Sequence, residues 1–228
     1  MLRALAELAA AGQVDATIAV HSPAHRAAPF VREADEAVEL GDSLADALLR
    51  ARAATAWLGP ASLDERAAFA AACEQAGVTP VGPGAAALRR LLPPRAVIEL
   101  AAELGVAPED ANARDPSASL VEVVVARDQD GATRVLGAGD ASLTLVDVAV
   151  VAESPPPLAP AEEAEAFDIA ERALTALGWR GIGAVRFAIA PGRRRLVLSG
   201  VDAFARSAPA VEEAVSYTHL TLPTICSV

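Results

Sequence analysis

Residues 119–157, SLVEVVVARDQDGATRVLGAGDASLTLVDVAVVAESPPP, decide the fold of this chain. Their first part, LVEVVVARD, alternates poorly and is rich in β-branched residues, which predicts a buried strand rather than a helix. The next part, DQDG at 128–131, has the composition of a hairpin turn, so ATRVLGAGD is the predicted returning strand. LTLVDVAVVAES predicts a third strand, which ends at three prolines because proline cannot pair inside a sheet. The stretch therefore predicts three strands in succession.

A helix and a second hairpin are expected after this stretch. Glu162, Glu163 and Glu165 follow Pro160 in the first turn of the predicted helix, where acidic side chains interact favourably with the helix dipole. We interpret them as capping residues rather than catalytic residues. Residues 178–200, GWRGIGAVRFAIAPGRRRLVLSG, predict the hairpin, with its turn at Pro191–Gly192.

In the first hundred residues, short apolar strands alternate with helices. Helices are predicted at 2–11, 43–53 and 64–76; Ser43 caps the second, and Gly12 and Gly77 end the other two. Strands are predicted at 15–21, within 33–41, at 54–58 and at 78–82. Strands and helices that alternate at this spacing are typical of a doubly wound α/β domain with a parallel sheet.

Composition and charge exclude several classes of protein. The 228 residues carry a net charge of −11, which argues against nucleic-acid or anionic-membrane binding, because a phosphate backbone requires clustered Lys and Arg. The basic run Arg193 to Arg195 is interpreted as a solvated turn. No apolar run reaches membrane-spanning length, and no signal peptide opens the chain. Cys73 is expected to be a small buried hydrophobe and Cys226 lies in the tail, so no disulfide framework is expected and a cytoplasmic location is favoured.

The second half of the chain resembles the carboxy-terminal half of the ATP-grasp fold of biotin carboxylases. That family reads H-V-E-x-Q-V-x-A-D-x-x-G-N, then L-x-E-R-D-C-S-x-Q-R-R-x-Q-K-V-V-E-E-A-P, a helix, and G-Y-x-G-A-G-T-x-E-F. The corresponding text here is LVEVVVARDQDGA (120–132), LGAGDASLTLVDVAVVAESP (136–155) and GWRGIGAVRF (178–187). Order, spacing and turn positions agree, so the resemblance implies a partial ATP-grasp (α+β) domain at 108–214.

The first half is similar to the amino-terminal domain of the same family. The family reads A-L-R-x-L-x-x-x-x-E-L-G-x-x-T-V-A-V-H-S, then A-D-E-A-V, F-L-S-E-N-A-x-F-A and G-x-x-F-I-G-P. Here the matching segments are LRALAELAAAGQVDATIAVHS, ADEAVEL, SLDERAAFA and GVTPVGP. The resemblance implies a biotin-carboxylase-like amino-terminal domain at 1–107, with a doubly wound parallel sheet.

Two segments of the family pattern are missing. The family's first strand and its glycine turn precede the helix that here begins at Met1, so we interpret Met1 as an internal or miscalled start. The lid subdomain, whose glycine-rich loop holds ATP phosphates, is replaced by VAPEDANARDPSAS (106–119), which leads directly into the central strand. The short GAG at 137–139 is interpreted as a β-turn or bulge rather than a phosphate-binding loop.

The tail at 215–228, VSYTHLTLPTICSV, resembles the translation of a transposon-based sequencing adapter. We interpret it as a sequencing-adapter artefact and exclude it from fold reasoning, the alternative being a natural edge strand. The gene product is then expected to be longer than this chain.

The resemblance implies a chemistry that the residues do not supply. Biotin carboxylases use ATP to activate bicarbonate and carboxylate biotin, and ATP-grasp enzymes hold Mg²⁺ with two acidic residues, because a hard cation takes oxygen ligands. The acid of G-T-x-E-F corresponds to Arg186. The acid of F-x-E-M-N corresponds to Leu198, and its asparagine to Gly200. An arginine reverses the charge at the metal and stays protonated at any working pH.

Other functional positions of the family are also substituted. The R-R-x-Q-K run corresponds to Leu145, Val146, Asp147, Val148 and Ala149, and the R-x-Q-V-E-H run to the region from Asp202 to Arg206. The ATP-binding lysine of M-G-D-K corresponds to Arg95, which is expected to be a surface residue at a helix start. The positions that keep family residues are expected to serve strands, turns and packing: Glu122, Asp140, Ser142, Glu153, Gly178, Gly181 and Gly183. We therefore predict no catalytic, cofactor-binding or metal-binding residues, and do not expect the family's ATP, Mg²⁺ and biotin to bind.

No unrelated site emerges from the sequence. His21 and His25 are too isolated for a metal pair and belong to a V-H-S turn that the family also has. Trp57 and Trp179 are expected in the core or at a contact between subdomains.

Three hypotheses about function remain open. The first is a non-catalytic biotin-carboxylase-like domain of a biotin-dependent acyl-CoA carboxylase, kept for assembly with the biotin carrier and carboxyltransferase regions or subunits. The second is an active ATP-dependent biotin carboxylase or other ATP-grasp ligase that uses displaced residues. The third is a non-functional gene fragment. The substituted metal positions and the missing lid favour the first or the third, and the intact turns and amphipathic helices favour the first.

Overall fold

The computed structural model describes residues 11–59, 61–109, 118–145, 148–153, 156, 158–189 and 195–203. The chain forms two compact units, Met1–Ala85 and Ala86–Val228, and each is described by itself. The predicted helix at 2–11, the turn at Pro191–Gly192, Cys226 and the whole tail at 215–228 lie outside the described residues.

The first unit contains two pairs of short parallel strands. β1 (Ile18–His21) pairs with β2 (Glu36–Glu39), and β3 (Thr55–Ala56) pairs with β4 (Thr79–Pro80). The predicted strands and their parallel pairing are therefore confirmed, in two sheets of two strands. A single turn of 3-10 helix, η1 (Pro23–His25), and the short helix α2 (Pro29–Arg32) join β1 to β2.

Two longer helices of this unit begin and end where the sequence predicts. In α3 (Leu44–Ala51), the Ser43 hydroxyl accepts a hydrogen bond from the Asp46 amide at 3.0 Å, which caps the helix. In α4 (Leu63–Ala76), Ser62 and Glu65 form a capping box, and Gly77 ends the helix in the left-handed conformation at φ 68°.

A small apolar cluster joins these helices. Cys73, on α4, is fully buried and packs with Leu48 of α3 and Val78, as the prediction of a small buried hydrophobe requires. Burial raises the pKa of the Cys73 thiol to about 11, so at neutral pH the group is an uncharged thiol.

The second unit, Ala86–Val228, begins with helices that pack on its sheet. After α5 (Ala85–Leu91), α6 (Ala96–Leu104) contacts both α7 (Pro160–Ala176) and β10 (Val197–Asp202), so it belongs with the sheet of the second unit. β5 (Ala107–Pro108) pairs in parallel with β10.

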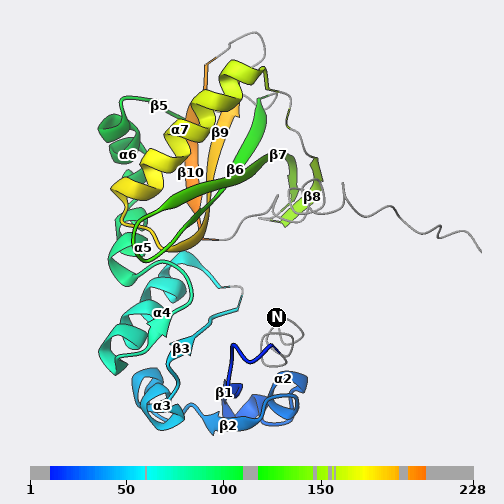
Figure 1. Ribbon diagram of the computed structural model, residues 1–228, viewed down its shortest axis with the longest axis vertical. Coiled ribbons are helices and arrows are strands. Elements are labelled where there is room, and N and C mark those ends of the chain that lie inside the picture. Colours follow the sequence, from blue (N-terminus) through cyan, green and yellow to red (C-terminus); the bar gives the residue numbers. More distant parts are fainter. Residues whose placement is uncertain are drawn as a thin grey trace, which may run out of the picture. The chain divides into compact units, whose positions relative to one another are not determined.

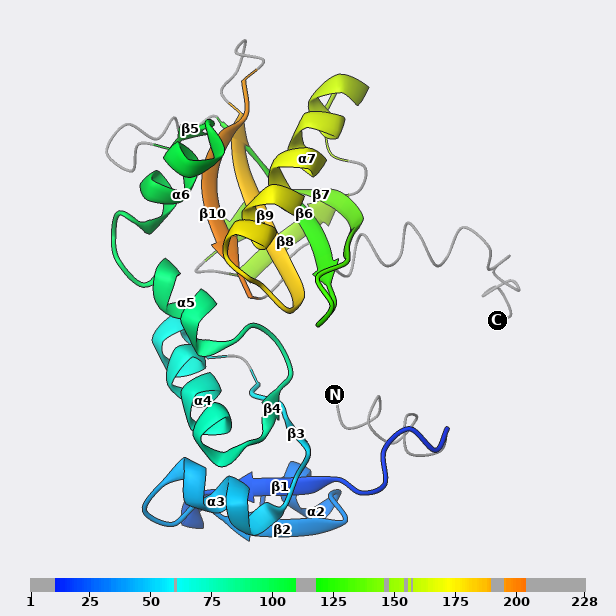
Figure 2. The ribbon, with the colours of Figure 1, turned by 60° about the vertical axis from the view of Figure 1, so that its left-hand side comes forward.

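The sheet of the second unit has the order β5-β10-β9-β6-β7-β8 (Figures 1 and 2). Its central strands are β6 (Ser119–Arg127) and β9 (Gly181–Ile189), which pair antiparallel from Ser119↔Ile189 to Arg127↔Gly181. Residues 109–118 join β5 to β6, a connection too short for a separate lid subdomain. The predicted α/β class is therefore the observed one.

The predicted hairpin after β6 is confirmed. β6 pairs antiparallel with β7 (Thr133–Leu145) through the turn at Asp128, whose carboxylate accepts a hydrogen bond from the Ala132 amide at 2.8 Å. The register shifts between Val124 and Val125, and Leu136 is the extra residue, so a bulge lies directly before the GAG segment, which itself pairs in regular register.

The third predicted strand, at 143–154, is corrected by the structure. Leu143 to Leu145 form the end of β7, and β8 (Val148–Glu153) pairs back on it, with Leu145 opposite Val148. Apolar residues on both sides of a chain reversal can pair with one another, so a continuous apolar run does not reveal where the reversal lies.

Helix α7 covers one face of this sheet and contacts β6, β7 and β9 (Figure 1). Glu162 accepts a hydrogen bond from the Ala159 amide at 2.8 Å, which confirms its predicted capping role. Trp179, directly after the helix, is fully buried, whereas Trp57 in the first unit is 45% exposed and is not a core residue. The aromatic residue type alone could not distinguish the two positions.

Two arginines connect the helix ends of the second unit. Arg90 of α5 donates to the last carbonyl of α7, that of Ala176, at 2.5 Å, and Arg172 of α7 donates to the last carbonyl of α6, that of Leu104, at 3.0 Å. A cation at a helix C-terminus satisfies free carbonyl groups and interacts favourably with the dipole, so these contacts hold the three helices together.

Candidate functional site

The face of the six-stranded sheet opposite α7 carries the charged residues that the sequence analysis singled out. Gly183 faces α7, because a Cβ atom there would meet Leu174 and Trp179. Side chains alternate between the faces of a strand, so Arg186 of β9 points to the opposite face. Its paired neighbours are Glu122 on β6 and Gly200 on β10.

The Arg186 side chain extends over β10. A Cβ atom built on Gly200 would lie 3.1 Å from Nη2 and 3.5 Å from Nε of Arg186, so the guanidinium lies directly above the glycine. Its Nη2 atom is 4.0 Å from Oδ2 of Asp202, two residues further along β10. Both side chains are about three-quarters shielded from solvent, with 23% and 27% exposure. This is a partly buried ion pair at the upper distance limit.

Glu122 adds a second carboxylate to this face. It is fully buried in the middle of β6 and stands opposite Arg186 in the β6–β9 register. A buried carboxylate is costly unless its surroundings compensate the charge, so its position beside an arginine is electrostatically favourable.

The structure corrects the predicted second metal position. Leu198 pairs with Phe187, not with Arg186, and its side chain is fully buried on the α7 side. Two ligands of one metal ion must share a face of the sheet, so Leu198 does not occupy the position of a metal ligand. The residue opposite Arg186 is Gly200, and Asp202 follows on the same face.

A bulge at Ser199 causes this difference. The register shifts between Leu198 and Gly200, and the Ser199 hydroxyl donates to Glu109 at 2.5 Å. The alignment counted residues without a bulge and therefore chose the wrong face. The glycine inside the apolar run LVLSGVD was the available signal, because an isolated glycine in a strand pattern suggests a bulge.

The residues on this face do not fit Mg²⁺ and ATP. The place of the first carboxylate holds the cationic Arg186, and its partner on β10 is a glycine without a ligating side chain. Across the described part of the chain, no group of three or more His, Cys, Asp or Glu side chains is arranged to hold a metal ion. Arg95, the aligned ATP-binding position, is exposed just before α6, as expected for a helix-start residue.

Several retained family positions have structural roles. The Ser142 hydroxyl accepts a hydrogen bond from the Leu120 amide at 2.9 Å and donates to the Asp140 carboxylate, which joins β7 to the start of β6. Gly178 and Gly181 have φ values of 62° and 79°, which favour glycine. Gly183 leaves room for the Trp179 ring, since a Cβ atom there would lie 2.6 Å from Trp179 Nε1.

The remaining aligned positions give little information. Leu145, Val148 and Ala149 form the β7–β8 pairing, whereas Val146, Asp147 and the segment 204–206 lie outside the described residues. Glu153 is the register partner of Asp140.

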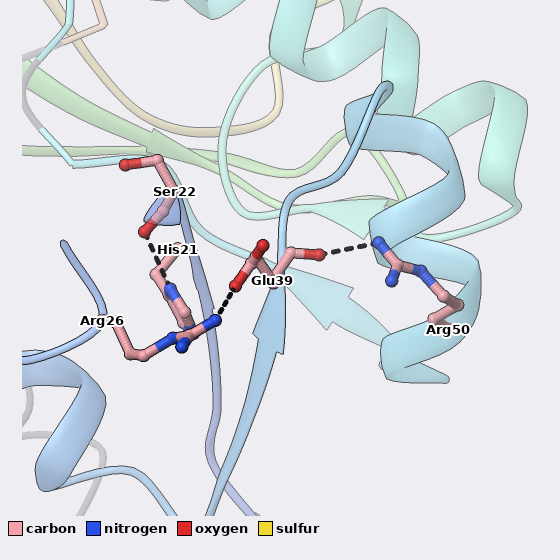
Figure 3. Close-up of polar contacts among 5 residues, drawn as sticks. All are labelled: His21, Ser22, Arg26, Glu39 and Arg50. Atoms are coloured by element: carbon pink, nitrogen blue, oxygen red, sulfur yellow. Dashed lines mark hydrogen bonds and ion pairs between the residues drawn. The ribbon is translucent and has the colours of Figure 1, made fainter. Parts of the chain in front are cut away.

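A second polar cluster lies at the carboxyl ends of β1 and β2 (Figure 3). Arg26 forms an ion pair with Glu39 at 2.6 Å, and Arg50 of α3 donates to the Glu39 carbonyl at 2.7 Å. The hydrogen bond from Arg26 lowers the pKa of Glu39. Arg50 therefore ties α3 to the end of β2, and Arg26 ties the β1–β2 connection to the same strand.

The two predicted histidines belong to this cluster and both contact Ser22. His21 is buried, and its Nδ1 lies 2.9 Å from the Ser22 carbonyl oxygen, so this nitrogen donates the hydrogen bond. His25 Nδ1 lies 2.8 Å from the Ser22 hydroxyl. These contacts hold the turn after β1. The sequence analysis missed Arg26, Glu39 and Arg50, because their contacts join segments that are distant in the sequence.

The comparisons with known proteins agree with this fold. Residues 1–88 match the family described as biotin carboxylase, N-terminal domain. The mitochondrial alpha subunits of methylcrotonoyl-CoA carboxylase from Glycine max and Oryza sativa subsp. japonica are 38% and 40% identical in alignments of 84 residues that cover 32% of this chain. The chain spans 12% and 11% of the length of these relatives.

Solved structures match over most of the chain. Kluyveromyces lactis urea carboxylase superposes with a TM-score of 0.77 at 26% identity, over 92% of this chain and 19% of that protein. Biotin carboxylase from Campylobacter jejuni, solved as a β,γ-ATP complex, superposes with a TM-score of 0.76 at 17% identity, over 95% of this chain and 65% of that protein. At this low identity the second match shows the fold alone.

A membrane-spanning segment was also sought. None of the helices that the structure describes is long and apolar enough to cross a membrane.

Proposed function

We propose that this chain, a biotin-carboxylase-like domain of the biotin-dependent carboxylases, is non-catalytic and serves the assembly of a larger acyl-CoA carboxylase. The observation that carries the proposal is Arg186. It stands where the resemblance requires a metal-binding carboxylate, and its guanidinium lies over Gly200 beside Asp202.

The charge of Arg186 argues against ATP-dependent catalysis on this face. Phosphoryl transfer depends mainly on positioning and on electrostatic stabilisation by metal ions and cationic groups. A fixed guanidinium repels Mg²⁺, and it cannot be neutralised by proton loss at any working pH. The connection at 109–118 also has no glycine-rich loop to hold a triphosphate.

The packing of the chain supports a retained structural role. Trp179 is buried against Gly183 in the interior, and at the surface Arg90 and Arg172 bind the last carbonyl groups of neighbouring helices. The relatives carry names of larger assemblies, such as a subunit of methylcrotonoyl-CoA carboxylase and a single-chain, multi-domain long-chain acyl-CoA carboxylase. We extend this context to the present chain: its partners would be the biotin-carrier and carboxyltransferase parts of such an assembly.

Steady-state turnover tests the proposal. The whole chain is incubated with MgATP, bicarbonate and free biotin, and ADP release is measured beside the Campylobacter jejuni biotin carboxylase as positive control. A cooperative thermal transition first establishes that the sample is folded. We expect ADP release at the level of the protein-free blank. Bicarbonate-dependent ADP release above that level would reject the proposal.

The second candidate is an active ATP-grasp ligase that uses displaced carboxylates. It is favoured by one observation, that Glu122 and Asp202 lie on the same face as Arg186. The turnover assay separates the two candidates, and Asp202→Asn identifies the site: if the chain is active, this variant should lose most of its ADP release.

A further inference from the structure

The first unit holds two pairs of parallel strands that share one layer of helices. α3 packs on both β1 and β2 and against α4, and α4 packs on β4. In the part of the chain that the structure describes, β1–β2 and β3–β4 are nevertheless separate two-stranded sheets. Each pair therefore has two edges, and the backbone groups along an edge are available to a further strand.

One edge of each pair is blocked. In β2, the carbonyl group of Glu39 points away from β1 and accepts a hydrogen bond from Arg50 at 2.7 Å. In β4, the amides of Thr79 and Val81 donate to carbonyl groups of β3, so the nitrogen of Pro80 points away from β3, where proline has no N–H group. Charged side chains and prolines are the means by which edge strands avoid further pairing.

The other edge of each pair, on β1 and on β3, is open. The His21 carbonyl accepts a hydrogen bond from β2 at 2.8 Å, and backbone groups alternate between the two sides of a strand, so Ile18 and Val20 direct theirs away from β2. By the same alternation, Thr55 and Trp57 direct their backbone groups away from β4. None of these four residues is a proline or charged, and no strand in the described part of the chain pairs with either edge.

The two open edges face the same space. α3 connects β2 to β3 and contacts β1, so the chain crosses over β1 and β3 follows on its far side. Both ribbon views show β1 between β2 and β3 (Figures 1 and 2). Strands joined by a crossover helix run in the same direction. One strand in this space, parallel to β1 and β3, could therefore bond with both edges and join the two pairs into one sheet.

We propose that the open edges of β1 and β3 bind one extended strand of a partner protein by parallel strand addition. Every strand that the structure describes has its place in one of the three sheets, so the added strand comes from a second polypeptide. A parallel strand with a neighbour on each side is buried, and the bound segment is therefore uncharged and rich in β-branched residues. Trp57, which is 45% exposed at the end of the β3 edge, lies where such a segment would shield it.

The inference rests on the assembly role proposed above and gives that role a contact. The turnover assay tests the absence of catalysis, whereas the experiments below test binding, so the two proposals can fail separately.

The probe is a fluorescein-labelled peptide, Lys-Thr-Val-Ile-Val-Thr-Lys, whose binding to the whole chain is followed by fluorescence anisotropy. Its matched control carries a methyl group on the backbone nitrogen of the isoleucine, which removes a donor and adds bulk at an edge. We expect saturable binding of the unmodified peptide. The methylated peptide should bind more weakly by roughly tenfold, as for the loss of one hydrogen bond.

Proline variants of the chain close the edges one at a time. The Val20 amide points away from β2, so Val20→Pro removes no hydrogen bond of the β1–β2 pair but removes a donor from the open edge. Thr55→Pro does the same on β3. Each should weaken binding of the peptide by roughly tenfold, whereas Val20→Ala and Thr55→Ala, which keep the amide, should bind it like the natural chain. A cooperative thermal transition checks that each variant is folded.

Amide hydrogen exchange, measured by NMR, follows the same edges residue by residue. In the natural chain, the amides of Ile18 and Val20 should exchange faster than those of Ala19 and His21, which face β2. The bound peptide should slow exchange at Ile18 and Val20, because their amides then donate to it. A change that merely stabilised the first unit would slow exchange at all four residues.

Three results would each overturn the proposal: no saturable binding to the natural chain, equal affinity for the two peptides, or unchanged exchange at Ile18 and Val20 in the complex. Self-association of the chain that Val20→Pro abolishes would assign the edge to a second copy and would equally contradict a partner strand. If a proline variant fails to fold, the two peptides and the exchange measurement still decide the question.

Discussion

The two faces of the six-stranded sheet differ in the kind of side chain that they carry. On the face toward α7, the central strands carry fully buried apolar residues, among them Val123, Val185 and Phe187. The opposite face carries Glu122, Arg186 and Asp202 on three adjacent strands. The first face needs volume and hydrophobicity alone, and the second needs particular charges. The apolar residues that stabilise the fold are therefore present on the first face. The second face carries Arg186 at the position where the resemblance implies a metal-binding carboxylate.

The largest expected effect comes from placing the same charge on each face in turn. Leu198→Glu puts a carboxylate into the α7-facing core, where burying an uncompensated charge costs roughly 3–5 kcal/mol of unfolding free energy. Gly200→Glu puts it beside the Arg186 guanidinium, so we expect a much smaller loss. Urea denaturation of both variants measures the difference, with Leu198→Met as the volume control.

Similar losses for the two glutamate variants would contradict the assignment of positions 198 and 200 to opposite faces. The same pair tests the corrected register directly. The structure places position 200 opposite Arg186, whereas the alignment without a bulge placed position 198 there. The glutamate that costs less stability identifies which of the two positions faces Arg186.

A smaller effect is expected from adding one methyl group to each face. Gly183→Ala places a Cβ atom 2.6 Å from Trp179 Nε1 and 3.0 Å from Leu174 Cδ1, and neither neighbour can move freely inside the core. Overpacking of this kind costs about 1–3 kcal/mol. Gly200→Ala meets the far end of the flexible Arg186 side chain instead and should cost less than half of that.

Chemical denaturation with Trp179 fluorescence as the probe checks this prediction. Trp57 is the other tryptophan and is exposed, so a Trp57→Phe background isolates the signal of the buried ring. If Gly183→Ala is as stable as the natural chain, the close packing of Trp179 on β9 is not a constraint on this sheet.

The sequence revealed the apolar face far better than the polar face. The β-branched composition, the DQDG turn and the capping residues predicted β6, β7, α3 and α7. These signals are local, because each depends on neighbours within a few residues. The bulge at Ser199 and the contact of Arg186 with Asp202 depend on how two strands pair, and counting along the sequence placed Leu198 on the wrong face.

The polar cluster of the first unit shows the same limit. The V-H-S turn was visible in the sequence, but the pairing of Arg26 with Glu39 and the contact of Arg50 with the end of β2 were not. The two tryptophans, both expected in the core or at a contact between subdomains, also differ in a way that residue type does not reveal: Trp179 is fully buried beside Gly183, whereas Trp57 is 45% exposed.

The smallest effect is expected at Glu39, where a solvent-exposed ion pair shifts a pKa without a large change in stability. The hydrogen bond from Arg26, followed by the charges of Arg26, His21 and Arg50, lowers the pKa of Glu39 in the folded chain. A group with a lowered folded pKa stabilises the fold above its unfolded pKa, and this contribution is lost as the pH falls through the folded pKa. Arg26→Ala should therefore raise the pKa of Glu39 and reduce the dependence of stability on pH in the acid range, because the small stabilisation that it removes is present at pH 7 and already lost in acid. NMR titration of the Glu39 side-chain carboxyl measures the shift, and Arg32→Ala, on the neighbouring helix α2, is the control for a lost surface charge.

An unchanged Glu39 pKa in Arg26→Ala would show that the ion pair at the carboxyl ends of β1 and β2 does not persist in solution. The hydrogen bond from Arg50 to the Glu39 carbonyl would then be the remaining one of the two arginine contacts at this end of β2.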